Sequence, residues 1–191
     1  MPDLPRVDAV DDSSTSLLIK IRRAFDPTGE RFTRLSDLAS AFSVRGEITN
    51  EADVDDWRLV DLDIVVRNEN LGGLLIFMDG PTWRHYLPIW LTIAATRGAE
   101  LRDFVSVVTT TLDPESTVLV DDASRFVERA STLTGAQRAA IADVFATFTS
   151  IPWIRANGRG LAHAERVAAL WRRGNIPVAE RGSRFEEPRH S

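Results

Sequence analysis

Five residues between positions 53 and 61 combine negative charge with one large aromatic side chain: Asp53, Asp55, Asp56, Trp57 and Asp61. Aspartates at this density attract a cationic partner and speed its encounter at low salt. Tryptophan is among the residue types that carry most of the binding energy at protein interfaces. The pattern therefore predicts a site for a protein with a basic surface, with the four aspartates as electrostatic contacts and Trp57 as the aromatic anchor.

The charge of the wider segment supports this prediction. Residues 47–63 hold seven carboxylates, and Arg58 is their single cation. Residues 1–80 contain 9 basic and 16 acidic side chains, whereas residues 155–191 contain 8 basic and 4 acidic ones, although the net charge of the whole chain is only -5. A solvated acidic loop explains the same residues without a partner, so both interpretations stay open.

The sequence offers no metal, cofactor or catalytic signature. An EF-hand loop starting at Asp53 would need glycine and glutamate where Arg58 and Ile64 stand. His163 and Glu165 match the His-x-Glu of zinc deaminases, but those enzymes take further ligands from cysteines and this chain has none. We therefore expect no metal, no cofactor and no catalytic residue, which favours a non-enzymatic protein and leaves activity open.

An alternative site is centred on Trp83, His85 and Tyr86, close to Pro88. An aromatic group of this kind can line a pocket for a small molecule, and proline frees a helix carbonyl that needs another partner. A polar cleft with His85 bonded to a carboxylate would indicate an enzyme or a ligand-binding protein. Aromatic residues at helical spacing also form ordinary core, in which case His85 would lie among apolar neighbours.

Two segments resemble a bacterial family of unknown function. The first is the aromatic-Arg-aromatic-Tyr-Leu-Pro block at residues 83–88, where His85 replaces the more usual aromatic residue. The second is the Leu-Thr-x-x-Gln helix start at residues 133–137. The resemblance spans roughly residues 14–150 and implies a small helical cytosolic bacterial protein. It brings no activity, cofactor or catalytic residue.

The elements that must position these residues are predicted to be mainly helices. Apolar residues at helical spacing predict six of them, at about residues 13–25, 35–42, 82–97, 101–112, 134–148 and 161–173. Residues 60–66 and 105–111 fit a strand or a helix, and residues 118–120 fit a loop or a short strand. The fold class is therefore mainly α: a compact single-domain bundle of about six helices, with room for one small strand pair.

The remaining expectations concern organisation and surroundings. Residues 1–12 are expected to be a flexible lead, 13–176 the helical domain and 177–191 a flexible tail. The longest apolar run, residues 74–78, is far too short to span a bilayer, so we expect a cytoplasmic protein with no membrane partner. Net acidity argues against nucleic acid as the partner. The oligomeric state is left open.

Overall fold

The protein is mainly α-helical, as predicted. The computed structural model describes residues 12–26, 31–41, 54–67, 74–117 and 123–174. The first half of the chain forms α1 (Asp12–Ala24), α2 (Leu35–Ala41), the 3₁₀ helix η2 (Trp57–Leu59), α3 (Leu62–Arg67) and α4 (Gly80–Arg97). The second half forms α5 (Arg102–Leu112), α6 (Pro114–Thr117), α7 (Ala123–Ser131), α8 (Gly135–Phe148), α9 (Pro152–Arg155) and α10 (Gly158–Arg173).

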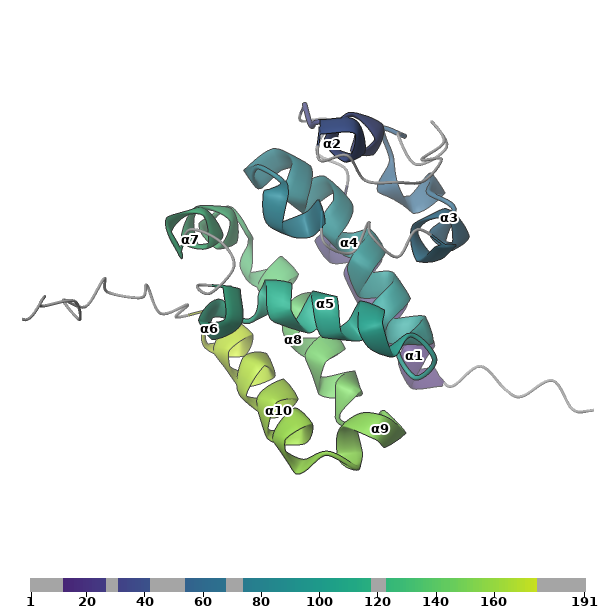
Figure 1. Ribbon diagram of the computed structural model, residues 1–191, viewed down its shortest axis with the longest axis vertical. Helices are drawn as coiled ribbons and strands as arrows, with labels where there is room; N and C mark the ends of the chain where they lie inside the picture. The colour runs from purple at the N-terminus through teal and green to yellow at the C-terminus, as the bar shows by residue number, and fades with distance from the viewer. Residues whose placement is uncertain (1–11, 27–30, 42–53, 68–73, 118–122, 175–191) are drawn as a thin grey trace, which may run out of the picture.

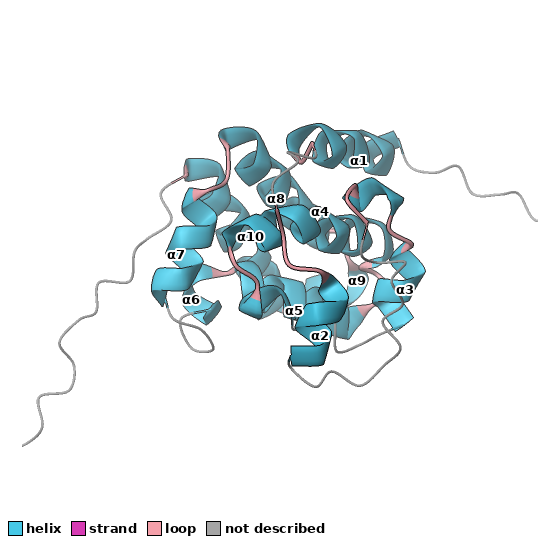
Figure 2. Ribbon diagram, turned by 90° about the horizontal axis from the view of Figure 1, so that it is seen from above, coloured by secondary structure: helices cyan, strands magenta, loops and turns pink. Residues whose placement is uncertain are grey.

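The structure divides the chain more finely than six helices. The short helices α6, α7 and α9 were not anticipated. Helices α6 and α9 have four residues each, too few to show a helical period, whereas the nine residues of α7 have a clear apolar side, with Phe126 and Ala130 buried, that the sequence analysis missed. No strand occurs in the described residues (Figure 2). Residues 118–120 lie outside them, as do residues 1–11 of the expected lead and all of the expected tail; Asp12 already belongs to α1.

Helix α4 lies at the centre and contacts α1, α3, α5, α7, α8 and η2 (Figure 1). Apolar residues lie on every side of it, which is typical of a helix enclosed by others. Helix α8 is buried in a similar way and packs mainly against α10. The core therefore forms around α4 and α8, and the other helices cover them.

Local sequence signals account for where the main helices begin and end. The Asp79 carboxylate accepts a hydrogen bond from the Thr82 amide and starts α4. The spacing of Thr134 and Gln137 in the sequence is that of a capping box, and both of its hydrogen bonds are present at the start of α8. Helix α10 ends at Gly174, whose φ of 69° is the left-handed conformation that glycine tolerates best.

Three positions that the sequence left ambiguous are helical. Residues 62–67 form α3, because the Asp61 carboxylate accepts the Asp63 amide and caps the helix. The β-branched run from Val105 lies within α5, where the Thr109 hydroxyl donates to the Val105 carbonyl. The missing N–H of Pro88 predicts a kink or a restart of the helix at this point; α4 is continuous from Gly80 to Arg97, so a restart does not occur. Within the described residues, no helix has the length and apolar character needed to cross a membrane.

Candidate functional site

The segment from Val54 to Asp63 lies against α4, and Trp57 holds it there. The Trp57 indole N–H donates to the Phe25 carbonyl oxygen at 2.6 Å, and the residue is only 4 % exposed. Val60, three residues later at the end of the 3₁₀ turn, is buried as well, so the side chains of Trp57 and Val60 face the core. Trp57 therefore fixes the segment from within, and its burial does not fit the predicted role of an exposed aromatic anchor.

His85 is a second fastening point for the same segment. Its Nε2 lies 3.1 Å from the Val54 carbonyl oxygen, which can only accept, so Nε2 carries the proton. The ring stacks on Phe32 with 3.7 Å between centroids and meets Tyr86 edge-on. Burial lowers the pKa of His85 more than the hydrogen bond to Val54 and the nearby carboxylates raise it, so the ring is neutral at pH 7.

The aromatic group predicted as an alternative pocket is part of the packed interior. Trp83 and Tyr86 have no exposed surface. The Tyr86 hydroxyl accepts a hydrogen bond from the Leu35 amide at 3.1 Å, which ties α2 to α4. The partner of His85 is a backbone carbonyl rather than a carboxylate. These contacts favour a positioning role for His85 and Tyr86, because their polar atoms hold neighbouring segments on α4. Trp83 is packed in the core, where its indole N–H has no hydrogen-bond partner among the described residues.

The carboxylates of the segment differ in how far they are neutralised. Asp56 caps η2 and forms a two-pronged ion pair with Arg58, with both shortest N–O distances at 2.8 Å. Arg58 holds the pKa of Asp56 below its usual value and also reaches Asp26 at 3.2 Å. Asp63 pairs with Arg97 at the end of α4. The fold thus pairs Asp63 with an arginine from a distant part of the sequence, which local sequence patterns could not indicate.

The carboxylates of Asp55 and Asp61 remain at the surface. Both residues are exposed, and Asp55 forms no ion pair or hydrogen bond within the described part of the chain. Asp61 uses one oxygen to cap α3. Asp53 lies outside the described residues. We call the exposed side chains of residues 55–63 the acidic surface.

Leu59 is the large apolar side chain of this surface. It is 73 % exposed and stands between Asp56 and Asp61 in the chain. Since residues 57 and 60 of the 3₁₀ turn face the core, residue 59 faces solvent. The sequence analysis missed Leu59, although the three-residue spacing of Trp57 and Val60 would have indicated it.

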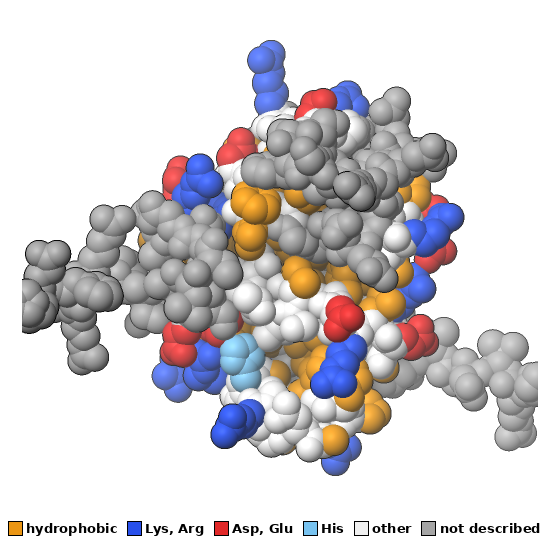
Figure 3. All heavy atoms as spheres, viewed as in Figure 1, with side chains coloured by type: hydrophobic (Ala, Val, Ile, Leu, Met, Phe, Trp, Pro, Cys, Tyr) orange, Lys and Arg blue, Asp and Glu red, His pale blue; other side chains and the backbone are white. Residues whose placement is uncertain are grey.

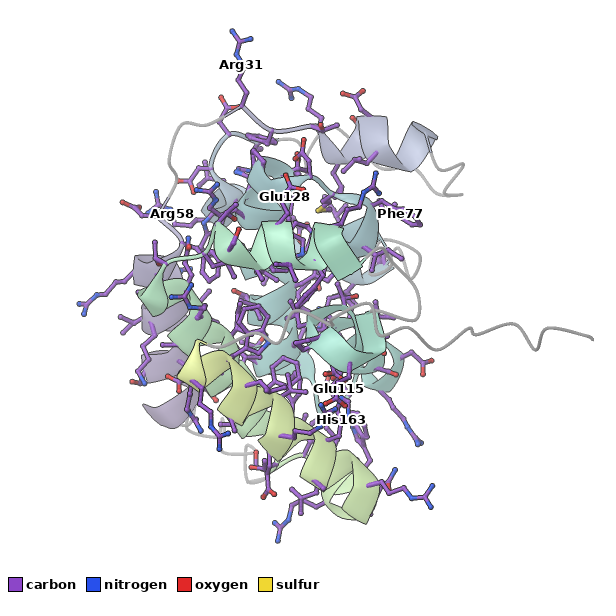
Figure 4. All side chains as sticks on the ribbon, turned by 90° about the vertical axis from the view of Figure 1, so that its left-hand side faces the viewer. Arg31, Arg58, Phe77, Glu115, Glu128 and His163 are labelled. Atoms are coloured by element: carbon purple, nitrogen blue, oxygen red, sulfur yellow. The ribbon has the colours of Figure 1, made fainter. Side chains whose placement is uncertain are left out.

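A second polar cluster joins α5, α6 and α10, and sequence analysis missed it too. Asp113 is 1 % exposed and ends α5, where one of its oxygens accepts the Glu115 amide of α6. Its other oxygen lies 3.0 Å from Arg166 Nη2 and 3.5 Å from His163 Nε2. Arg166 also pairs with Glu115 at 2.8 Å. Figure 4 shows Glu115 and His163 next to each other, with Arg58 on the opposite side of that view.

This cluster is arranged to hold helices rather than to move protons. Arg166 has only donors, so the His163 Nδ1 at 3.2 Å from it must accept, and the proton lies on Nε2 towards Asp113. Both ring nitrogens of His163 therefore face charged side chains of the cluster. Among the described residues, no group of three or more histidines and carboxylates could hold a metal ion.

Comparisons with known proteins do not assign this chain to a family. No family model, no curated protein and no solved structure matches the chain. The resemblance to the bacterial family of unknown function, carried by residues 83–88 and 133–137, stays a prediction.

Proposed function

We propose that this protein is a non-enzymatic binding module of the bacterial cytoplasm, whose acidic surface binds a protein with a basic surface. A concrete form is an immunity-type or inhibitor protein that covers the basic site of a toxin or nuclease. The observation that carries the proposal is the exposed side chain of Leu59. It lies in a segment rich in carboxylates that the buried Trp57 fixes to the core through its hydrogen bond to Phe25. An apolar centre with a polar rim is the usual arrangement of a protein interface.

The segment is fixed in advance of binding, which favours affinity. Trp57 bonds to Phe25, His85 bonds to Val54, and Arg58 joins Asp56 to Asp26. A partner would therefore not have to order residues 54–63, and the entropy cost of binding is reduced accordingly. Within the aromatic group of α4, His85 helps to fix this segment and Tyr86 holds α2, and both bond to backbone groups. The geometry around His85 therefore supports a binding module better than a small-molecule pocket.

The roles of the residues follow from this arrangement. Leu59 replaces Trp57 as the proposed apolar anchor, because Trp57 is in the core. Asp55 and Asp61 are the proposed long-range attractants, since both are exposed. Asp56 contributes charge but is already paired with Arg58. Asp53 keeps the role that the sequence predicts for it.

The proposal is tested by identifying a partner and measuring how it binds to surface variants. The wild-type chain is used to capture proteins from a lysate of its own bacterium, and the purified partner is then titrated against L59S. We expect L59S to weaken binding at least about tenfold, since removing a central apolar contact costs about 1.4 kcal/mol or more. The matched control is I19S, because Ile19 is 45 % exposed on α1, outside the acidic surface.

A charge variant tests the electrostatic half of the proposal. Replacing Asp53, Asp55, Asp56 and Asp61 with asparagine keeps the size of each side chain and, at positions 56 and 61, a capping oxygen. Association with the partner should become slower and less sensitive to salt. Unchanged association kinetics, or an L59S variant that binds as well as I19S, would contradict the proposed function.

A further inference from the structure

A pocket of about 290 Å³ lies between α3 and the start of α5, next to the acidic surface. Its walls are formed by Val66 of α3, the run from Glu100 to Phe104, and Val107. Four of these side chains are apolar and only partly buried: Val66, Leu101, Phe104 and Val107. When another apolar group covers apolar side chains that are partly exposed around a concave site, the free energy of the system falls.

The charged residues that line this pocket are two acids, Glu100 and Asp103, and one base, Arg102. Glu100 and Asp103 are exposed, and neither forms an ion pair or a hydrogen bond through its side chain with any residue that the structure describes. The guanidinium of Arg102 lies 5.5 Å from the centre of the Trp153 ring of α9, so its charge is already engaged with an aromatic ring of the same molecule. The first-turn position of Asp103 also suits the α5 dipole, but Glu100 precedes the helix and has no such explanation.

Figure 3 shows this face of the molecule, across which α5 runs in Figure 1. Near its centre, hydrophobic side chains in orange adjoin isolated acidic and basic ones in red and blue. The pocket is continuous with the acidic surface through α3, because Val66 is a wall of the pocket and Asp63 lies one turn earlier on the same helix.

We propose that this pocket receives an apolar side chain of the partner that is flanked by lysine or arginine. The apolar walls would take the side chain, and Glu100 and Asp103 would face the flanking cations. The inference rests on the proposed function, because it assigns the pocket to the same basic partner. It adds a second contact region, so that the partner would bind on both sides of α3.

Two short peptides test the chemistry of the pocket without the partner. The probes are acetyl-Lys-Leu-Phe-Lys-amide and acetyl-Glu-Leu-Phe-Glu-amide, which share their apolar centre and differ in charge. Each is titrated into the ¹⁵N-labelled full chain while its amide signals are followed by NMR. We expect the lysine peptide to shift the signals of Val66, Leu101, Phe104 and Val107, and the glutamate peptide to bind at least about fivefold more weakly.

Matched variants locate the binding. E100Q/D103N should weaken the lysine peptide by about fivefold and remove most of its salt dependence. The control E128Q/E165Q changes the net charge equally and should have no effect, since both glutamates are exposed and lie on α7 and α10. V107T keeps the shape of the wall but adds a hydroxyl, and it should weaken both peptides.

The possible results separate this inference from the proposed function. Absence of shifts at the pocket, or equal binding of the two peptides, overturns the pocket assignment. If the partner loses affinity with L59S but binds E100Q/D103N like wild type, the proposed function stands and the pocket inference fails. If the lysine peptide binds at the pocket but L59S and the four-aspartate variant bind the partner normally, the proposed function fails.

Discussion

At the scale of single residues, buried hydrogen bonds decide which part of the acidic segment is available to a partner. Trp57 donates inward to Phe25, and His85 holds Val54. These two bonds orient the short turn so that Leu59 and Asp61 are exposed. A buried polar atom that loses its partner costs more than the bond itself contributes, so both contacts strongly fix the segment.

The indole hydrogen bond of Trp57 gives a stability prediction. W57F removes the donor and leaves the Phe25 carbonyl without it, so we expect the free energy of unfolding to fall by about 2 kcal/mol. Urea denaturation measures the change. W153F is the control, because the Trp153 indole N–H is buried without a hydrogen-bond partner in the described structure and its loss should cost less. Equal effects of the two substitutions would show that the bond to Phe25 is unimportant.

His85 gives a prediction about pH. Its pKa is lowered by burial from the ordinary value of 6.5, so the unfolded chain binds a proton at a pH where the folded chain does not. The contribution of His85 to stability is therefore complete above pH 6.5 and decreases as the pH falls below it, down to the lowered pKa.

The experiment compares wild type with H85Q, which keeps a donor for the Val54 carbonyl but does not titrate. Urea unfolding is followed from about pH 7.5 to about pH 5.5, where the aspartates are still ionised. Wild type should lose stability across this range more steeply than H85Q. Parallel pH profiles would mean that His85 is as easily protonated in the folded chain as in the unfolded one.

At the scale of elements, polar side chains stabilise the helix ends by accepting hydrogen bonds from backbone amides. Asp79, Thr134 and Asp61 each start a helix, and Asp113 both ends α5 and caps α6. Asp113 also binds Arg166, so it joins the end of α5 to the middle of α10. A buried carboxylate in this position fixes the relative placement of two helices that are distant in the sequence.

The effect of Asp113 can be measured with D113N. This change leaves Arg166 with Glu115 but removes the buried negative charge, and we expect it to cost about 2 kcal/mol of stability. The value is below the 3–5 kcal/mol typical of a broken buried pair, because Arg166 is 35 % exposed. Thermal unfolding provides the measurement. E115Q, at the exposed end of the same network, should cost less than about 1 kcal/mol, and a larger loss there than in D113N would contradict this assignment.

Helix ends can be predicted from the sequence, whereas contacts between distant segments cannot. The capping box at Thr134 and the glycine stop at Gly174 are local patterns, and the structure confirms both. The inward direction of Trp57 depends on Phe25, 32 residues earlier. The pairing of Asp63 with Arg97, 34 residues later, is equally invisible to local spacing. Long-range contacts of this kind decide which charges of a segment stay exposed.

At the scale of the whole molecule, the uneven charge of the chain has a spatial counterpart. The helices α2 and α3 lie towards one end of the long axis, and α9 and α10 lie towards the other (Figure 1). The acidic surface belongs to the first end, whereas the exposed Arg155, at the end of α9, and Arg159, at the start of α10, belong to the second. A charge distribution of this kind orients a charged partner before contact as well as attracting it.

Because the two kinds of charge lie at opposite ends, an experiment can distinguish two ways of attracting the partner: by the position of the acidic surface, or by the net charge of the whole chain. The variant R155Q/R159Q makes the chain more negative at the end away from the acidic surface. If attraction depended on net charge alone, association with the basic partner would become faster, as the extra negative charge increases the overall field.

If position decides, charges at the far end of the molecule are largely screened from the docking site at physiological salt, and the rate should change by less than about twofold. We expect this second result at about 150 mM salt, with an acceleration appearing only well below it. Stopped-flow association over a salt series measures both regimes. A variant that is slowed at any salt concentration would instead place part of the partner's docking site on α9 and the start of α10, at the basic end of the molecule.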